Sequence, residues 1–434
     1  MQGLIGPLKE LAEFEELCKN KKKDVGMIRV CGCVNSQKSH MMYAIGDGCK
    51  YKVIACSSET KAKQIYEEYR FLDSNTYLYP AKDFLFYQAD IRSKELVKQR
   101  MEGIQAVLSG EPVTVVTSLD GFMDHLAPKE SIAEKVLKVQ NDSVLKLDEM
   151  AEKLSVIGYD REVQVEGPGQ FAVRGGILDI YPLTEELPVR IELWGDEIDS
   201  IRSFDAQSQR SLENLDEIMI YPAAEQPIEK GEVTFIDYFK DGDSMLFLDE
   251  LNHLEENAKA VEEEFQQSCR NRQEKGETTL SGNWMCSWEE LCKKLNRRNC
   301  IGLSLLDPRK SGWKITGQFN LTVKSMNSYQ SSFELLVKDL KQYKKEGYRI
   351  VLLSGSRTRA ERLAKDLQDE GLSAFYGKDS DRILEPGEIM VVYGHARRGF
   401  QYPLIKFAVI TESDIFGQEQ KKKKKKKVQS RQKN

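Results

Sequence analysis

The chain has 434 residues, of which 31% are charged and 40% hydrophobic, with a net charge of −5. At about 100–200 residues per domain this length predicts several domains, and the composition is typical of a globular protein. No apolar run approaches the roughly 18 residues of a membrane-spanning helix, and the N-terminal residues lack the pattern of a secretory signal. We therefore expect a cytoplasmic protein rather than a membrane-embedded or secreted one.

The nine cysteines include no Cys-x-x-Cys pair, although structural zinc sites need ligand pairs at turn spacing. We therefore expect reduced thiols and no metal site. The four histidines, His40, His125, His253 and His395, are scattered along the chain, and none is expected to be catalytic.

The last 17 residues, 418–434, contain nine basic residues and one acid. Such a segment is either a disordered, solvated linker or a contact for nucleic acid or another acidic surface. The rest of the chain is acidic, which argues against a protein that mainly coats DNA by neutralising phosphates.

Helix and strand signals alternate over the first 120 residues. The predicted strands are 27–33, 53–56, 77–79 and 113–116, and the predicted helices are 38–44, 60–72 and 94–108. Strands separated by helices indicate a parallel sheet that helices cover on both faces.

Short alternating strands with turn signals follow from about residue 125. A helix is predicted at 148–157, and strands at 163–166, 170–174, 177–181, 189–194 and 198–204. The apolar residues of 189–194 point to one side, and Arg190 and Glu192 point to the other. This pattern predicts a compact antiparallel unit with one polar face, and a bulge or sharp bend at the Gly175-Gly176 pair.

A second α/β unit is expected from residue 327. Its predicted helices are 333–345 and 358–370, and its predicted strands are 349–354, 389–393 and 407–411.

The segment from Gly32 to Ser39 has the position of a phosphate-binding loop, because it follows a strand and precedes a helix. The pattern G-x-x-x-x-G-K-[ST] uses its second glycine for a turn that aims N–H groups at phosphates. Gln37 stands at that position, although Lys38 and Ser39 remain in register. A non-glycine residue is strained at positive φ and places a side chain where the phosphate would lie. The loop is interpreted as a degenerate structural turn, with functional nucleotide binding as the alternative.

Asp249 and Glu250 follow an apolar strand, which is how Mg²⁺ and a hydrolytic water are held in P-loop motors. Acids after a strand also begin helices, because they favour the first turn. Arg357 and Arg359 lie at another strand-to-helix junction, where they could contact phosphate or simply begin a solvated helix.

Five residues on or beside the short strands could form a protein-binding face: Arg161, Arg174, Tyr181, Arg190 and Glu192. Arginine and aromatic residues dominate the binding energy of protein interfaces. A plain solvent-facing sheet is the alternative.

Several segments resemble the N-terminal part of the bacterial transcription-repair coupling factors. The clearest is GPGQFAVRGGILDIYPLTEELPVRIELWGDEIDSIRSFDAQSQRS at 167–211, and others are YPAKDFLFY (79–87), EPVTVVTSLDGFM (111–123) and FAVITESDIFG (407–417). The VRGGILDI(Y/F)P block is also similar to the excinuclease protein UvrB, but the degenerate loop and the lack of an evident damage-probing hairpin favour the coupling factors.

The resemblance implies an α/β fold with five segments. A degenerate RecA-like lobe would comprise residues 1–120 and 207–326, with a small α+β domain that binds the excinuclease protein UvrA inserted at 121–206. A small α/β domain would follow at 327–417, and a basic linker at 418–434.

The resemblance also implies which residues bind UvrA. By motif, Arg174 is the arginine of the V-R-G block, and Tyr181 takes a place usually held by Phe. Arg190 and Glu192 form the R-x-E pair of the following strand, and Arg161 matches in a looser register.

The parent family is an ATP-dependent DNA translocase that continues beyond these segments. In that family, a motor domain binds ATP and Mg²⁺, and further domains contact RNA polymerase and double-stranded DNA. This chain lacks the signatures of those domains. We therefore expect a fragment or truncated product that holds no cofactor, is catalytically inactive and recruits UvrA in nucleotide excision repair. The alternative is an ATP-dependent helicase of the UvrB type, in which Gln37, Lys38, Asp249 and Glu250 would serve.

Overall fold

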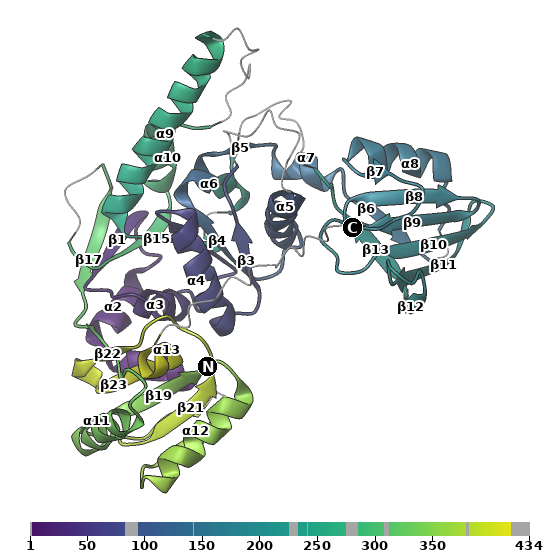
Figure 1. Ribbon diagram of the computed structural model, residues 1–434. Helices are drawn as coiled ribbons and strands as arrows, with labels where there is room; N and C mark the ends of the chain where they lie inside the picture. Colours follow the sequence, from purple (N-terminus) through teal and green to yellow (C-terminus); the bar gives the residue numbers. More distant parts are fainter. Residues whose placement is uncertain are drawn as a thin grey trace, which may run out of the picture. The chain divides into compact units, whose positions relative to one another are not determined.

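The computed structural model describes residues 2–82, 94–141, 143–224, 233–240, 242–274, 285–307, 312–378 and 382–417 (Figure 1). The backbone divides into two compact units. The large unit contains residues 17–32 and 42–320, and the small unit contains residues 1–16, 33–41 and the described part of 321–434. The end of the YPAKDFLFY motif and the whole basic segment 418–434 lie outside the described residues.

The first sheet of the large unit has seven parallel strands. In spatial order they are β17 (Ile315–Asn320), β1 (Gly26–Cys31), β16 (Asn299–Ser304), β15 (Ser244–Asp249), β2 (Tyr51–Cys56), β4 (Val113–Ser118) and β3 (Thr76–Tyr79). The four strands predicted in the first 120 residues are confirmed, with boundaries shifted by at most two residues. Three later strands, β15, β16 and β17, complete the sheet.

Helices cover this sheet because its strands are apolar on both sides. The helices α4 (Glu59–Leu72) and α5 (Lys94–Leu108) contact β3 and β4, whereas α9 (Leu251–Glu274) contacts β15 and β16. Val53, Val115 and Leu246 are buried in the shared core. Ser58 begins α4 by accepting a hydrogen bond from the Lys61 backbone N–H at 3.3 Å, which satisfies one of the exposed donors of its first turn.

The second sheet of the large unit has six strands. Their order is β12 (Ser211–Leu215), β11 (Glu197–Phe204), β10 (Val189–Trp194), β9 (Ile177–Tyr181), β8 (Gln170–Arg174) and β7 (Asp160–Arg161). Neighbouring strands are antiparallel except β7 and β8, which are parallel. The strand predicted at 163–166 is wrong. Residues 166 and 167 donate their backbone N–H groups to the Gln170 side chain instead, at 2.9 Å each.

One face of the six-stranded sheet carries its hydrophobic core. Phe171, Ile180 and Ile191 pack there with Leu154 of α8 (Leu147–Val156). The strand pair β6 (Leu137–Gln140) and β13 (Glu217–Ile220) adds further apolar side chains to this core. The predicted alternation is confirmed, because every second residue of β9 and β10 is buried on this side and its neighbours face away.

The small unit contains a mixed six-stranded sheet. Its order is β18 (Lys324–Ser325), β22 (Phe400–Tyr402), β23 (Phe407–Thr411), β19 (Arg349–Ser354), β21 (Ile389–Tyr393) and β20 (Ala374–Tyr376). Its helices include α11 (Phe333–Glu346), α12 (Arg357–Asp369) and α13 (Glu412–Phe416), together with the start of α3 (Gln37–Ile45) and the N-terminal α1 (Gln2–Ile5). Gly347 ends α11 at φ 78°, a left-handed conformation that suits glycine.

The α/β class expected from the sequence is confirmed by these sheets and their helices. The five-segment division stays a prediction. Within the described ranges no helix combines the length and hydropathy of a membrane span. In the same ranges no group of three or more His, Cys, Asp or Glu side chains is placed to hold a metal ion.

Candidate partner-binding face and degenerate nucleotide loop

The face of the six-stranded sheet away from its main core carries charged side chains beside a small buried apolar cluster of Val165, Ala172 and Phe204. Strand pairing places Asp179 opposite Arg190 and Arg190 opposite Arg202, while Glu192 and Arg174 both pair with Ile177. Paired residues share one side of a sheet. We call this surface the open face, and it brings together four of the five predicted residues, Arg174, Tyr181, Arg190 and Glu192.

Asp179 is the centre of the open face. Its side chain is 1% exposed, and it accepts three hydrogen bonds from two arginines. Arg190 donates Nε–H to Oδ1 at 2.7 Å and Nη2–H to Oδ2 at 2.9 Å, and Arg174 donates Nη2–H to Oδ2 at 2.6 Å. A buried carboxylate needs such charged donors, since it loses its hydration on folding.

Arg190 is largely enclosed. Its side chain is 14% exposed, its Nη2 also donates to Gln209 Oε1 at 3.0 Å, and its guanidinium lies 4.6 Å from the Phe204 ring centroid. Hydrogen bonding to Asp179 raises the pKa of Arg190 above its ordinary value. This arginine therefore stays charged, and it stabilises the open face rather than presenting free N–H groups to a partner.

Arg174 is the more accessible of the two arginines, with 45% of its side chain exposed. Only its Nη2 bonds to another described residue, namely Asp179. Its remaining N–H groups are thus available to a carboxylate of a partner, while Asp179 fixes the direction of the guanidinium.

Glu192 forms an ion pair with Arg202 and lies 3.5 Å from the Ser200 hydroxyl, which donates to it. The sequence prediction did not include Asp179 or Arg202. The period of two that placed Arg190 and Glu192 also places Asp179 beside Ile177 and Tyr181 on the same face, so the signal for Asp179 was present.

Two predicted residues lie away from the cluster around Asp179, namely Tyr181, which is still on the open face, and Arg161. Tyr181 donates its hydroxyl to the Glu186 carbonyl at 2.8 Å, toward the opposite end of β9 from Arg174. Arg161 pairs with Phe171 in the parallel β7–β8 ladder, and Phe171 points into the core. The register therefore assigns Arg161 to the side opposite the open face, on an exposed edge strand.

The degenerate loop adopts a different conformation from the one expected. The non-glycine residue with positive φ in the loop is Asn35, at 31°, rather than Gln37. The strain expected at Gln37 is therefore wrong, because Gln37 is the first residue of α3. Its side chain is fully buried. Its Oε1 accepts from Val34 N at 3.2 Å, and its Nε2 donates to the Tyr402 hydroxyl at 2.9 Å.

A chain of hydrogen bonds continues from Gln37 through the small unit. The His40 Nε2 lies 2.8 Å from the Leu4 carbonyl, so this nitrogen carries the proton, and Nδ1 accepts from the Tyr402 hydroxyl at 3.2 Å. Burial lowers the pKa of His40 to about 4. The neutral ring therefore links α1, α3 and β22 with each of its nitrogens bonded.

Other polar groups of the loop also face the protein. Ser36 Oγ accepts the backbone N–H groups of Arg397 and Arg398, both at 3.1 Å. Lys38 and Ser39 are each 3% exposed. In a phosphate-binding loop such groups bind the nucleotide. In this chain the protein itself provides the hydrogen-bond partners of Ser36 and Gln37. The expectation that this chain holds no nucleotide stays a prediction.

The acidic pair after β15 also serves the fold of the large unit. Asp249 is buried, and Glu250 precedes α9 in a left-handed conformation with φ 57°. Glu250 Oε1 accepts the Leu305 backbone N–H at 3.1 Å. The helix begins directly after the pair at Leu251, so neither acid lies in its first turn. The role of the pair therefore stays a prediction. Gly32, in the same unit, donates its N–H to the Leu305 carbonyl at 3.1 Å.

Arg357 and Arg359 lie exposed in the first turn of α12. Ser354 donates its hydroxyl to Glu412 Oε1 at 2.6 Å, and Arg359 lies 3.6 Å from Glu412 Oε2. A carboxylate of the chain itself therefore lies near the N-terminus of α12, where an anion would be favoured.

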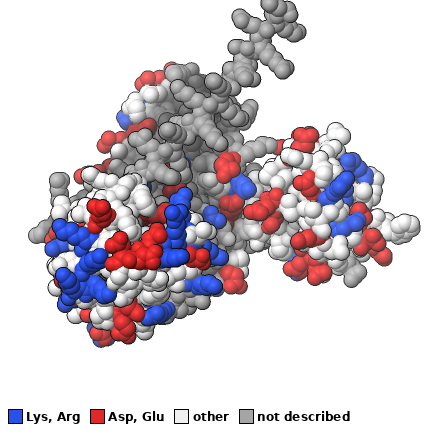
Figure 2. Space-filling view, turned by 60° about the horizontal axis from the view of Figure 1, so that its bottom comes forward, with Lys and Arg blue, Asp and Glu red and all other residues white. Residues whose placement is uncertain are grey.

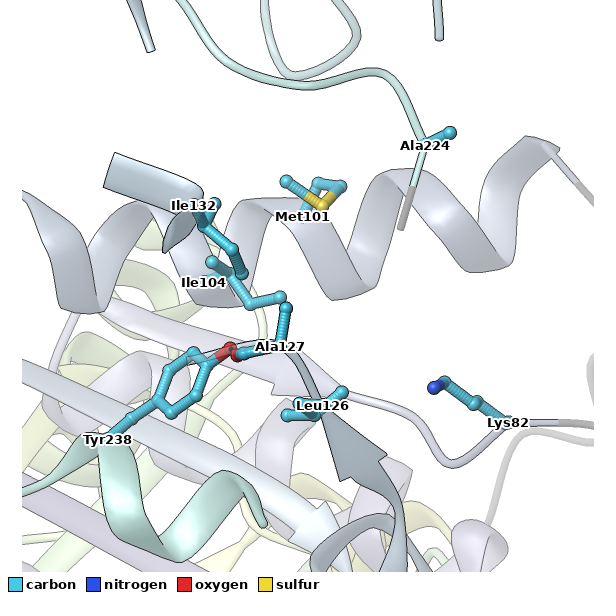
Figure 3. A pocket seen from close by; sticks show the side chains of 8 residues that line it. All are labelled: Lys82, Met101, Ile104, Leu126, Ala127, Ile132, Ala224 and Tyr238. Carbon is cyan, nitrogen blue, oxygen red and sulfur yellow. Dashed lines mark hydrogen bonds between the residues drawn. The ribbon is translucent and has the colours of Figure 1, made fainter. Parts of the chain in front are cut away.

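The large unit also contains a small cavity of about 10 Å³ (Figure 3). Its lining is mostly aliphatic and comprises Lys82, Met101, Ile104, Leu126, Ala127, Ile132, Ala224 and Tyr238. The Tyr238 hydroxyl already donates to the Ala127 carbonyl at 2.5 Å. A space of this size holds at most about one water molecule, so we assign no ligand to it.

Comparison with known proteins places the open face in a recognised domain. A family model described as the UvrB interaction domain matches residues 137–225. A transcription-repair-coupling factor of Bacillus subtilis is 26% identical over 470 residues, covering 94% of this chain and 40% of that protein. Another from Staphylococcus haemolyticus is 25% identical over 408 residues, covering 80% of this chain and 34% of that protein.

The resemblance to transcription-repair-coupling factors is confirmed. It extends over most of the chain, whereas the chain spans 40% or less of the length of these two relatives. The UvrB interaction domain match begins at Leu137, the first residue of β6, and includes every strand of the six-stranded sheet. The open face therefore lies within the part of the chain that resembles this domain.

Proposed function

We propose that this chain acts in transcription-coupled nucleotide excision repair and recruits the excinuclease protein UvrA through the open face. The observation that carries the proposal is the match of the UvrB interaction domain to the sheet on which Asp179 orients Arg174. The similarity to transcription-repair-coupling factors supports the repair pathway.

The chemistry of the open face supports a protein partner. An accessible arginine, held by a buried carboxylate, is suited to bind a carboxylate on another protein in a charge-assisted pair. Tyrosine and a glutamate–arginine pair lie on the same face, and arginine and aromatic residues are enriched among interface hot spots. The partner we expect therefore presents at least one acidic side chain to Arg174.

The test is titration calorimetry of the whole chain against UvrA, with Arg174→Ala alongside. We expect the variant to bind at least about tenfold more weakly, which corresponds to about 1.4 kcal/mol or more. Truncation should spare the fold, because Arg174 is half exposed and Arg190 still pairs with Asp179.

Lys153→Ala is the matched control, since Lys153 is an exposed cation of α8 on the core side of the same domain. We expect it to bind like the wild type. Equal affinity for wild type and Arg174→Ala would refute the assignment of the open face. Absence of binding by every variant would refute recruitment itself.

ATP hydrolysis and DNA translocation are proposed for the parent family rather than for this chain, and so are the contacts to RNA polymerase and double-stranded DNA. The buried Gln37, Lys38 and Ser39 support this view, and the helicase alternative is not favoured. Figure 2 shows acidic and basic side chains interspersed on the described surface in view, which gives little support to broad phosphate neutralisation.

A further inference from the structure

We propose that Trp194 is a further contact residue of the open face and packs against an apolar side chain of UvrA. This inference rests on the proposed function, because it extends the same surface. Neither the domain match nor the similarity to the coupling factors assigns a role to this residue.

The exposure of Trp194 sets it apart from the other described tryptophans. Trp194 is 85% exposed, whereas Trp288 and Trp313 are 8% and 7% exposed and pack against each other. A tryptophan offers one of the largest apolar surfaces of any side chain, and its burial on binding releases ordered water. Single exposed apolar residues are common on proteins, so the position of this one on the sheet decides the argument.

Trp194 continues the open face along β10. Residues 189, 191 and 193 of this strand pack on the core side. Arg190, Glu192 and Trp194 alternate with them and therefore share the opposite side. The register shift between β10 and β11 after Glu192 adds its extra residue to β11 and leaves the alternation within β10 intact.

The neighbouring strands leave the indole uncovered. On one side Trp194 pairs with Glu197, which is itself exposed. On the other side lies the Gly175-Gly176 turn, where Leu193 N donates to the Gly176 carbonyl at 2.8 Å. A Cβ on Gly176 would lie 2.9 Å from the Leu193 carbonyl oxygen. The close approach of this turn thus depends on a residue without a side chain, and nothing from it can shield the ring.

The same end of the sheet carries the accessible charged groups of the open face. Arg174 is the last residue of β8 and immediately precedes the glycine turn. Glu192 pairs with Ile177, the first residue after that turn. Arg174, Glu192 and Trp194 therefore lie at the same end of the sheet, while the enclosed Asp179–Arg190 pair lies further along it.

This arrangement defines the chemistry of the partner surface. An acidic side chain would face the unbonded N–H groups of Arg174, and an aliphatic or proline side chain would lie against the indole of Trp194. Apolar anchors beside a charge-assisted pair are typical of the few residues that dominate binding energy.

The first experiment is calorimetric titration of the whole chain with UvrA, comparing wild type, Trp194→Ala and Trp194→Phe. We expect Trp194→Ala to bind about 30-fold more weakly, the size of a hot-spot truncation. The phenylalanine variant should retain most of the affinity, because it keeps an apolar ring. Val156→Ala, at an exposed apolar position of α8, is the control and should bind like the wild type.

The second measurement uses the fluorescence of Trp194 in the unaltered protein. Binding should shift the emission of this exposed indole to shorter wavelength, and the shift should be absent from a parallel titration of Trp194→Phe. This readout depends on burial of the ring and would not respond to a purely structural effect of the alanine variant.

The outcomes separate this inference from the function on which it rests. If Arg174→Ala loses binding while Trp194→Ala keeps wild-type affinity and no spectral shift occurs, the contact at Trp194 is refuted and recruitment stands. If the wild type does not bind, both are refuted. Loss of affinity in Trp194→Ala with an unchanged melting profile, together with the spectral shift, establishes the contact.

Discussion

Asp179 is the counter-ion of two guanidiniums on the open face, and its carboxylate is buried. Replacement by asparagine keeps the shape but removes the charge, and it leaves Arg190 enclosed without its counter-ion. Breaking a buried pair in this way costs about 3–5 kcal/mol.

We expect Asp179→Asn to lower the free energy of unfolding by about 3 kcal/mol, near the lower end of that range because Arg174 can turn to solvent. Chemical denaturation of the purified variant measures the loss. Asp199→Asn, at an exposed position of β11, should change stability by less than about 0.5 kcal/mol. Similar small losses for both variants would show that Asp179 is not an electrostatic anchor.

The face on which a side chain lies could be predicted for residues within a strand of clear alternation. Alternation placed Arg190 and Glu192 together, and the structure adds Arg174 and Tyr181 to the same face. Arg161 could not be placed in this way, since its side depends on a parallel pairing with β8 that local sequence does not reveal. The enclosure of Arg190 by Gln209 and Phe204 depends on the pairing of β10 with β11 and on the turn after β11, which alternation alone does not reveal.

At the scale of elements, the hydrogen-bonded link through His40 joins three segments of the small unit. Burial of the ring lowers the pKa of His40 to about 4, below the ordinary value of about 6.5. Above pH 6.5 the folded and unfolded states are both neutral at this residue, and its contribution to stability is fully present. As the pH falls from 6.5 to 4, only the unfolded state takes up the proton, so that stability is progressively lost.

The wild type should therefore lose about 2 kcal/mol at pH 5 relative to pH 7 through His40 alone. The measurement is urea unfolding at both pH values for wild type and His40→Asn, whose difference isolates this residue from the carboxylates that titrate in the same range. An identical pH dependence of the two proteins would contradict a neutral, buried His40.

Elements were predicted well where apolar periodicity was long. The helices of the first 120 residues and the principal strands of both α/β sheets lie within about three residues of their expected bounds. Residues 163–166 were mistaken for a strand because Val163 and Val165 alternate with polar residues. Short strands such as β7 and β18 had too few residues to show a period, and they form because a neighbouring strand offers hydrogen bonds.

At the scale of the whole molecule, contacts assign the two parts of the degenerate nucleotide motif to different units. The loop residues 33–41 belong to the small unit, and Asp249 and Glu250 belong to the large one. A sequence motif shows which residue types are present. It does not show which parts of the fold form hydrogen bonds with those residues. Tyr402 lies 365 positions beyond Gln37 and bonds to its amide.

Restoring the glycine of the motif should therefore not restore nucleotide binding. We expect neither wild type nor Gln37→Gly to release heat when titrated with ATP and Mg²⁺, because Ser36 and Tyr402 remain engaged within the small unit. The variant should also unfold more easily by about 1–3 kcal/mol, as it loses two buried hydrogen bonds. Saturable ATP binding by either protein would revive the helicase alternative.

The single hydrogen bond that Arg174 donates to Asp179 has a consequence for the selectivity of docking. Holding a long side chain still at an interface costs about 0.5–1.5 kcal/mol in lost rotamer freedom. In this chain much of that ordering is completed during folding, because the sheet already aims the guanidinium before any partner arrives. A partner carboxylate that lies in line with the guanidinium therefore binds without most of that ordering cost. A carboxylate displaced from this direction binds more weakly, although its charge is the same.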